Sequence, residues 1–191
     1  MHRLSSSFVL GYHGCDRTVG ESLLKGNPFR PSNNDYDWLG PGIYFWESNP
    51  QRGLDFARDT ARLKPSGIRE PFVVGAVLDL GLCLDLTTTA GVEWIKTAFD
   101  SLAKNTAAGG VPLPSNRKDG RRHLDCAVMR RLHSILESLG TPAVDTVRGV
   151  FVEGKPIYPG AGFDEKTHIQ IVVRTQRSIK GVFRVPGERS L

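Results

Sequence analysis

The chain has 191 residues, of which 39% are hydrophobic and 24% are charged, a composition typical of one soluble globular domain with a sizeable core. No apolar stretch approaches the length of a membrane-spanning helix, so we expect no membrane partner. The formal net charge is +5, and the isoelectric point of about 9.3 favours acidic partners such as nucleic acid. The three cysteines, Cys15, Cys83 and Cys126, lie too far apart for metal or redox spacing. We therefore expect no metal site and a reducing, cytoplasmic setting.

The first part of the chain predicts a strand, a short helix and a loop. Residues 8–12 form an apolar run that leads directly into His13, which places an imidazole at the end of a strand. A capping-box pattern that begins at Thr18 predicts a helix of about two turns. Residues 27–37 are rich in Pro, Ser, Asn and Asp without periodicity, so this segment is expected to be a loop.

An aromatic strand follows this loop. The turn Gly40-Pro41-Gly42 is pre-set to deliver the chain into it, since glycine permits tight backbone geometry and proline fixes φ. Period-two alternation places Ile43 and Phe45 on one side of the strand and Tyr44 and Trp46 on the other. One side can join a core, and the other offers an aromatic wall beside the glycine turn.

The remaining elements follow from apolar periodicity and from Gly and Pro signals. Helices are expected from Pro50 to about residue 64, over residues 92–102 and over residues 124–139, and strands at 72–78, 80–86, 144–152, 167–174 and 179–185. Residues 104–120 are predicted to form an exposed loop within a helical insertion of about residues 87–141, and the last two strands are expected to pair antiparallel. This order predicts a single α+β domain over residues 1–191 with antiparallel sheets.

Three separated segments carry a resemblance to a known family. They are Tyr12-His13-Gly14-Cys15, Leu39-Gly40-Pro41-Gly42-Ile43-Tyr44-Phe45 and the strand that contains Gln170. Their order and spacing are similar to those of the poly(ADP-ribose) polymerase-like, diphtheria-toxin-type ADP-ribosyltransferases. There, the first segment ends His-Gly-Ser or His-Gly-Thr, the second reads Gly-x-Gly-Ile-Tyr-Phe, and the third is headed by Glu in polymerising members. The resemblance implies an ADP-ribosyltransferase-like fold in which split, antiparallel or mixed sheets and flanking helices form an NAD cleft.

The resemblance also implies roles for single residues. His13 is similar to the histidine that hydrogen-bonds the adenine-side ribose of NAD, and Gly14 to the glycine whose backbone holds the nicotinamide carboxamide. Tyr44 is similar to the tyrosine that stacks on nicotinamide, and Phe56 to the ring on the opposite side. The loop at residues 32–35 stands where the family has a loop that covers the dinucleotide. NAD carries a cationic ring, which suits such an aromatic clamp.

The chain departs from the polymerising members at the late strand. Gln170 occupies the position of their glutamate, with His168 two residues earlier on the same face. An amide can hydrogen-bond a ribose hydroxyl but cannot act as a base, so we expect the transfer of single ADP-ribose units, with His13, Tyr44 and Gln170 as catalytic residues. Glu47 is the acidic candidate nearest to Tyr44 in sequence. A catalytic carboxylate and a solvated charge at the strand end both remain open for it.

A basic cluster in the second half of the chain is either a solvated face or a patch that follows phosphates. Its members are Arg117, Lys118, Arg121, Arg122, Arg130 and Arg131. We expect an NAD-dependent mono-ADP-ribosyltransferase that modifies a macromolecular acceptor, with nucleic acid, RNA above all, favoured over protein. The resemblance further implies a bacterial toxin or anti-phage effector, which leaves room for an antitoxin partner. The alternatives are a protein-modifying transferase, an NAD glycohydrolase, an RNA 2′-phosphotransferase and a non-catalytic NAD- or ADP-ribose-binding module.

Overall fold

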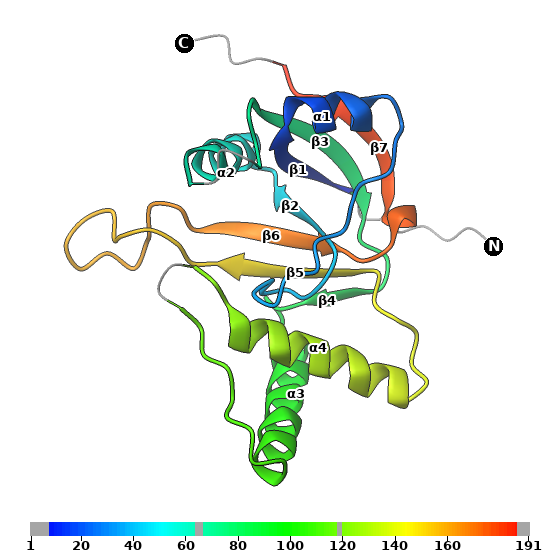
Figure 1. Ribbon diagram of the computed structural model, residues 1–191, viewed down its shortest axis with the longest axis vertical. Coiled ribbons are helices and arrows are strands. Elements are labelled where there is room, and N and C mark those ends of the chain that lie inside the picture. The colour runs from blue at the N-terminus through cyan, green and yellow to red at the C-terminus, as the bar shows by residue number, and fades with distance from the viewer. Residues whose placement is uncertain (1–7, 64–66, 118–119, 187–191) are drawn as a thin grey trace.

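The computed structural model describes residues 8–63, 67–117 and 120–186, and Figure 1 shows the arrangement of their elements. The strands are β1 (Phe8–Asp16), β2 (Ile43–Glu47), β3 (Pro71–Asp79), β4 (Cys83–Asp85), β5 (Thr146–Phe151), β6 (His168–Val173) and β7 (Ile179–Arg184). The helices are α1 (Arg17–Leu24), α2 (Pro50–Leu63), α3 (Thr89–Ala108) and α4 (His123–Ser138), with a short 3₁₀ turn, η1 (Gln176–Ser178).

One sheet contains all the described strands, in the order β4-β5-β6-β2-β1-β3-β7. Neighbouring strands are antiparallel except for the parallel pair β4 and β5. The mixed α/β architecture with a mostly antiparallel sheet is as expected. The sheet is continuous and not divided into two, but the join between β1 and β2 covers only two residue pairs, against nine between β1 and β3. The sheet therefore opens at this join.

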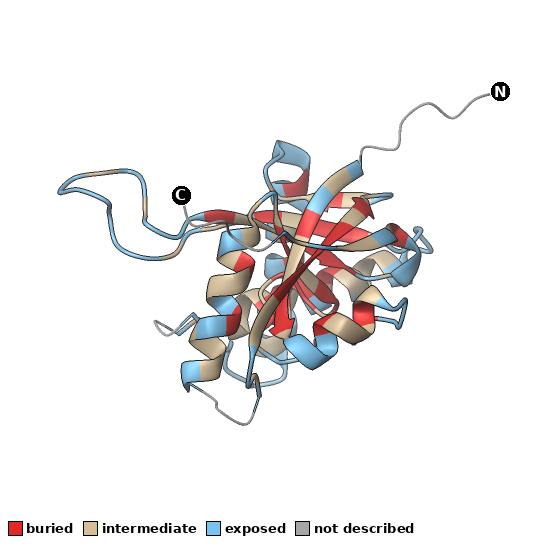
Figure 2. Cartoon of the chain, turned by 90° about the horizontal axis from the view of Figure 1, so that it is seen from above, coloured by how far each residue is buried: buried red, intermediate tan, exposed pale blue. Residues whose placement is uncertain are grey.

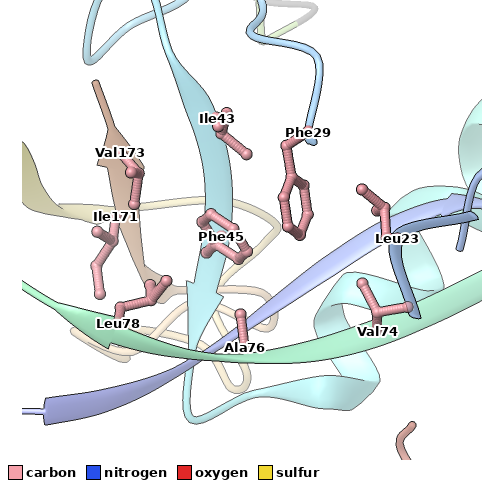
Figure 3. Packing of buried hydrophobic residues seen from close by; sticks show 9 residues of the cluster. All are labelled: Leu23, Phe29, Ile43, Phe45, Val74, Ala76, Leu78, Ile171 and Val173. Carbon is pink, nitrogen blue, oxygen red and sulfur yellow. The ribbon is translucent and has the colours of Figure 1, made fainter. Parts of the chain in front are cut away.

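One face of the sheet carries the first hydrophobic core (Figure 3). Phe45 of β2 is fully buried there, between Phe29 from the loop after α1 and Ile171 from β6. The cluster consists of Leu23, Phe29, Ile43, Phe45, Val74, Ala76, Leu78, Ile171 and Val173. Because Ile43 and Phe45 both belong to it, the predicted alternation along β2 is confirmed for this face.

The other face of the sheet carries the second core and three of the helices. Helices α3 and α4 pack there on β4, β5 and β6, and Tyr44 packs against this cluster, not against the first one. The cluster consists of Leu39, Leu84, Ala98, Val128, Met129, Leu132, Val144, Val147 and Val172. Helix α2 lies on the same face over β1. The two approach so closely that a side chain at Gly14 would collide with the carbonyl of Gly53 in α2.

Several local predictions are wrong. Strand β1 continues past His13 to Asp16, so the imidazole lies within the strand and not at its end. Helix α1 begins two residues earlier than expected, since its N-cap is Asp16, whose carboxylate accepts a hydrogen bond from the backbone N–H of Thr18 at 2.9 Å. Helix α3 continues to Ala108, so the exposed loop starts later than residue 104. Strand β7 pairs with β3, while β6 lies between β2 and β5.

The segment between β5 and β6, residues 152–167, extends away from the body of the protein (Figures 1 and 2). It is mostly exposed, and its two arms are joined by a hydrogen bond of 3.0 Å from the Ile157 backbone N–H to the Phe163 carbonyl. Two ion pairs fasten its base to α2, one between Arg52 and Glu153 and one between Asp59 and Lys166. We call residues 152–167 the β5–β6 arm.

Within the described ranges, no helix is both long and apolar enough to cross a membrane.

The close approach of α2 to β1 leads to a first prediction. A methyl group at residue 14 would lie 2.0 Å from the Gly53 carbonyl oxygen, so Gly14→Ala forces backbone apart. We expect this change to lower the free energy of unfolding by about 2–3 kcal/mol, the cost of overpacking. Urea unfolding followed by circular dichroism measures the loss. Gly181→Ala is the matched control, because nothing lies within 4 Å of its added methyl group, and an equal loss in both variants would contradict the prediction.

Candidate functional site

The candidate site is the opening between β1 and β2. The Leu10 carbonyl accepts a hydrogen bond of 2.8 Å from Ser48, so the backbone groups of Leu10 face β2. Backbone groups alternate in direction along an antiparallel ladder, so those of Tyr12 and Gly14 face the same way. The pairing ends at Tyr12 with Trp46. The N–H and C=O of Gly14 therefore point into the opening.

His13 holds the opening in place. Its Nδ1 lies 2.9 Å from the carbonyl oxygen of Tyr44, the group that Gly14 would pair with if the ladder continued. A carbonyl only accepts, so Nδ1 carries the proton and Nε2 is left as an acceptor. The ring packs against Phe29 and Phe45, with centroids 5.3 and 5.7 Å away. Burial lowers the pKa of His13, which keeps the imidazole neutral.

Tyr44 is fixed from the other side of the strand. Its hydroxyl donates to the Gly40 carbonyl at 2.9 Å and accepts from the backbone N–H of Leu39 at 3.1 Å. Burial raises the pKa of Tyr44, so the phenol stays protonated. The glycine turn that the sequence singled out thus orients the ring, and Gly40 has the positive φ of 82° that this turn needs.

Gln170 lies beside Trp46 and has a fixed orientation. The indole Nε1 of Trp38 donates to its Oε1 at 2.6 Å, and its own amide nitrogen lies 3.0 Å from Nε2 of His168. His168 in turn donates from Nδ1 to the Lys166 carbonyl at 2.5 Å, which fixes its tautomer as an acceptor at Nε2. One amide N–H of Gln170 remains to donate to a ligand.

Aromatic rings surround Gln170. Phe56 of α2 packs on Trp46 at 4.9 Å, so the ring expected to face Tyr44 is placed against its neighbour on the same face of β2. Trp38 and Phe151 complete the wall, with centroids 5.1 Å apart. The sequence predicted that Trp46 lies on the same side of β2 as Tyr44. Trp38 and Phe151 were not predicted, since they come from a loop and a strand that only the fold brings together.

Glu47 lies on the opposite face from Gln170. Its carboxylate accepts two hydrogen bonds from Arg148, at 2.6 and 3.2 Å, and Arg148 also contacts Asp85 at 3.1 Å. Arg148 is the register partner of Ile171, which belongs to the first core. The structure therefore places Glu47 apart from Tyr44 and Gln170, in a partly buried ion-pair network.

The expected basic patch does not form one free surface. Arg130 donates to the Asn33 side chain at 2.7 Å, and Arg131 donates to Ser101 of α3 at 2.8 Å. These two arginines therefore connect α4 to other elements. Lys118 lies outside the described residues.

Of the other members of the basic cluster, Arg121 and Arg122 directly precede α4, and Arg122 lies beside the aromatic wall. The guanidinium of Arg122 lies 5.3 Å from the ring centroid of Phe151, and that of Arg121 lies 5.7 Å from Tyr36. The backbone N–H of Arg117 donates to the Arg121 carbonyl at 2.7 Å. Positive charge thus reaches the edge of the wall around Gln170.

The loop expected to cover a dinucleotide is tied down next to the glycine turn. Ser32 and Gly42 exchange two backbone hydrogen bonds, of 2.8 and 3.0 Å. The buried Asp37 accepts from the Ser32 hydroxyl at 2.7 Å and from the Asn34 backbone at 2.8 Å. Arg130 holds the outer part of the loop through Asn34. The loop is therefore a defined part of the rim of the site.

No family model matches the chain, and no solved structure matches it. A stretch of 36 residues, 19% of this chain, is 47% identical to "Uncharacterized protein MJ0359" of Methanocaldococcus jannaschii. The matched stretch is 17% of that protein, whose name assigns no activity.

The position of Glu47 leads to the second prediction. Glu47→Gln removes the charge that faces Arg148, a partner with 19% of its side chain exposed, so we expect a stability loss of about 1–3 kcal/mol. We expect no change in any turnover at the opposite face, where Gln170 lies. Thermal unfolding and an NAD-consumption assay on the same preparation measure the two effects. Intact stability combined with lost turnover would make Glu47 a catalytic residue after all.

Proposed function

We propose that the chain is a mono-ADP-ribosyltransferase that uses NAD as its substrate. The observation that carries the proposal is the pair of Gly14 backbone groups that point into the opening next to the Tyr44 carbonyl. A backbone donor and acceptor side by side match the acceptor and donor of a primary carboxamide, the group that nicotinamide carries. The resemblance of the same two segments to the ADP-ribosyltransferase family supports this assignment.

The residues around the opening can perform the tasks that the reaction requires. Cleavage of the bond between nicotinamide and ribose builds positive charge on the ribose, and the leaving ring takes the electron pair. Gly14 would hold the carboxamide, and Tyr44 would lie against the ring. The free acceptor nitrogen of His13, Nε2, can bind a ribose hydroxyl. Gln170 would direct its remaining amide N–H at a hydroxyl of the nicotinamide-side ribose.

Gln170 favours the transfer of single units. A growing polymer requires a base to take the proton from a ribose hydroxyl, and an amide has no such capacity. His168, the titratable neighbour of Gln170, is buried and accepts a hydrogen bond from it. Burial lowers the pKa of His168, so its ring is neutral, and its Nε2 is already occupied. The proposed product is therefore a single ADP-ribose on each acceptor site.

A non-catalytic NAD- or ADP-ribose-binding module is the second candidate. The supporting observation is that hydrogen bonds to Trp38 and His168 fix both the oxygen and the nitrogen of the Gln170 amide. A donor held in this way can bind a ligand without taking part in a reaction. The NAD glycohydrolase alternative needs the same site with water as the acceptor.

For the acceptor, we propose a nucleic acid, with RNA favoured over protein. The supporting feature is the arrangement of Arg121 and Arg122 beside Tyr36 and Phe151 at the edge of the site. Cationic groups interleaved with rings suit single strands, whose bases stack while arginines neutralise phosphates. A toxin or anti-phage effector role in bacteria, with an antitoxin to restrain it, is the biological setting that the family resemblance suggests.

The third prediction tests the NAD site. Tyr44→Ala removes the stacking wall and Tyr44→Phe keeps it, although the hydroxyl contact with Gly40 is lost. We expect NAD consumption to fall at least about tenfold in the alanine variant and to stay near wild type in Tyr44→Phe. His13→Ala should also lose activity, since the opening loses its support. Wild-type rates in both alanine variants, with folding verified by circular dichroism, would refute the site.

The fourth prediction concerns the acceptor. Labelled NAD incubated with RNA, DNA and protein from one lysate should place discrete, single-unit label on nucleic acid. Activity should fall steeply as salt rises, because phosphate contacts release counterions. Arg122→Glu should weaken labelling, while Arg131→Glu, which faces Ser101 of α3, serves as the comparison. Label found only on protein would contradict the nucleic-acid proposal. Release of nicotinamide with no label on any macromolecule would indicate a glycohydrolase.

A further inference from the structure

Arg52 of α2 is a largely buried cation with most of its hydrogen-bonding capacity unused. Only 11% of its side chain is exposed, and Nη2 lies 2.5 Å from a carboxylate oxygen of Glu153. Its Nε and Nη1 are buried and have no hydrogen-bond partner among the described residues. A guanidinium carries five N–H donors in a fixed fork, so one ion pair leaves much of it unsatisfied.

Trp46 adds another unused donor in the same place. Its side chain is buried, its Nε1 has no partner among the described residues, and the guanidinium of Arg52 lies 5.9 Å from its ring centroid. A buried donor without a partner costs about 1–3 kcal/mol, so a cluster of three such nitrogens calls for a physical reason.

This cluster borders the site around Gln170. Trp46 is the direct register partner of Gln170 across β2 and β6, so the two side chains share one face of the sheet. The ring of His168, which binds Gln170, lies 6.3 Å from Trp46. Arg52 is also one helical turn before Phe56, whose ring covers Trp46. The unused donors therefore lie next to the place where the proposed chemistry occurs.

Glu153 shows which kind of group the cluster accepts. Its carboxylate, with 32% of the side chain exposed, contacts a single nitrogen of Arg52 from the start of the β5–β6 arm. The arm is mostly exposed, and its base is fastened to α2 by this ion pair and by the pair of Asp59 and Lys166. Rotation of the Glu153 side chain would open the guanidinium to another anion without disturbing the sheet.

We propose that Arg52 and Trp46 form a phosphate-binding subsite, in which Glu153 is an exchangeable substitute for the phosphate. A phosphate offers more acceptor oxygens than the carboxylate does, so it can use the nitrogens that Glu153 leaves unpaired, and arginine forks suit phosphate geometry. Either the pyrophosphate of NAD or a phosphate of a nucleic-acid acceptor can supply this group. The subsite itself rests on the contacts of Arg52, and only the source of the phosphate rests on the proposed function.

Binding measurements on the full chain test the subsite without relying on activity. Calorimetric titration compares ADP with adenosine, and a short oligoribonucleotide with a 5′-phosphate with the same oligonucleotide ending in a 5′-hydroxyl. The variants are Arg52→Gln, Arg52→Lys and Glu153→Gln. Arg58→Gln is the matched control, since Arg58 is an exposed arginine on the same helix that pairs with Asp55.

We expect the phosphate-bearing probe to bind more tightly than its phosphate-free form in the wild type. Arg52→Gln should reduce this affinity ratio about tenfold or more, and Arg52→Lys should keep part of it. Glu153→Gln should tighten phosphate binding several-fold, because it removes the internal competitor. Arg58→Gln should leave the difference unchanged. An effect on ADP alone identifies the NAD pyrophosphate as the source, and an effect on the oligonucleotide alone identifies the acceptor.

Three results would overturn the subsite. They are equal binding of the phosphate-bearing and phosphate-free probes, equal losses in Arg52→Gln and Arg58→Gln, and a Glu153→Gln variant that fails to tighten. The Glu153→Gln measurement distinguishes a structural ion pair from an exchangeable one even if Arg52→Gln does not fold. Failure of the transferase assay with intact ADP discrimination would reject the proposed reaction and leave the subsite standing.

Discussion

The hydrogen bond between the His13 imidazole and the Tyr44 carbonyl is the constraint on which the site depends. It takes the acceptor that the next rung of the β1–β2 ladder would use, so the two strands separate after two residue pairs. Backbone groups of Gly14 then face an opening instead of a neighbouring strand. Burial lowers the pKa of His13, so the ring is neutral, and donation from Nδ1 to Tyr44 leaves Nε2 as an acceptor.

The two faces of β2 have different surroundings. Ile43 and Phe45 fill the first core, and Glu47 on the same face joins Arg148 in an ion-pair network. Tyr44 and Trp46 point to the other face, where Gln170 lies. A substitution on one face can therefore change stability with little effect on the other, which is why Glu47 and Gln170, both polar groups near the same strand, have different expected roles.

Gln170 is held by its neighbours in a way that makes it a donor. Trp38 occupies its carbonyl oxygen and His168 one of its amide hydrogens, so the orientation of the amide is fixed before any ligand arrives. Such pre-organisation lowers the entropy cost of binding. On the same face, Arg52 and Trp46 hold donors without partners among the described residues, so this part of the sheet offers hydrogen-bond donors to an electron-rich ligand.

The sequence alone determined the elements and the alternation of β2, because period-two and helical patterns reflect burial directly. It also singled out His13, Gly14, Tyr44 and Gln170 as candidates, and the structure places them on the neighbouring strands β1, β2 and β6. It failed where distant segments meet. The pairing of β7 with β3 depends on which sheet edge is free, and the short join of β1 and β2 depends on one side chain capturing a carbonyl.

The surroundings of Gln170 were also decided only by the tertiary structure. Trp38 comes from a loop 132 residues away in sequence, and no local pattern encodes its hydrogen bond to Gln170. The arginines that looked like one basic run in the sequence are divided by the helical period, so Arg131 faces α3 while Arg130 holds the loop at Asn33. Sequence patterns record which residues are buried and which are turn formers. The contacts that decide charge and donor placement arise when distant segments pack.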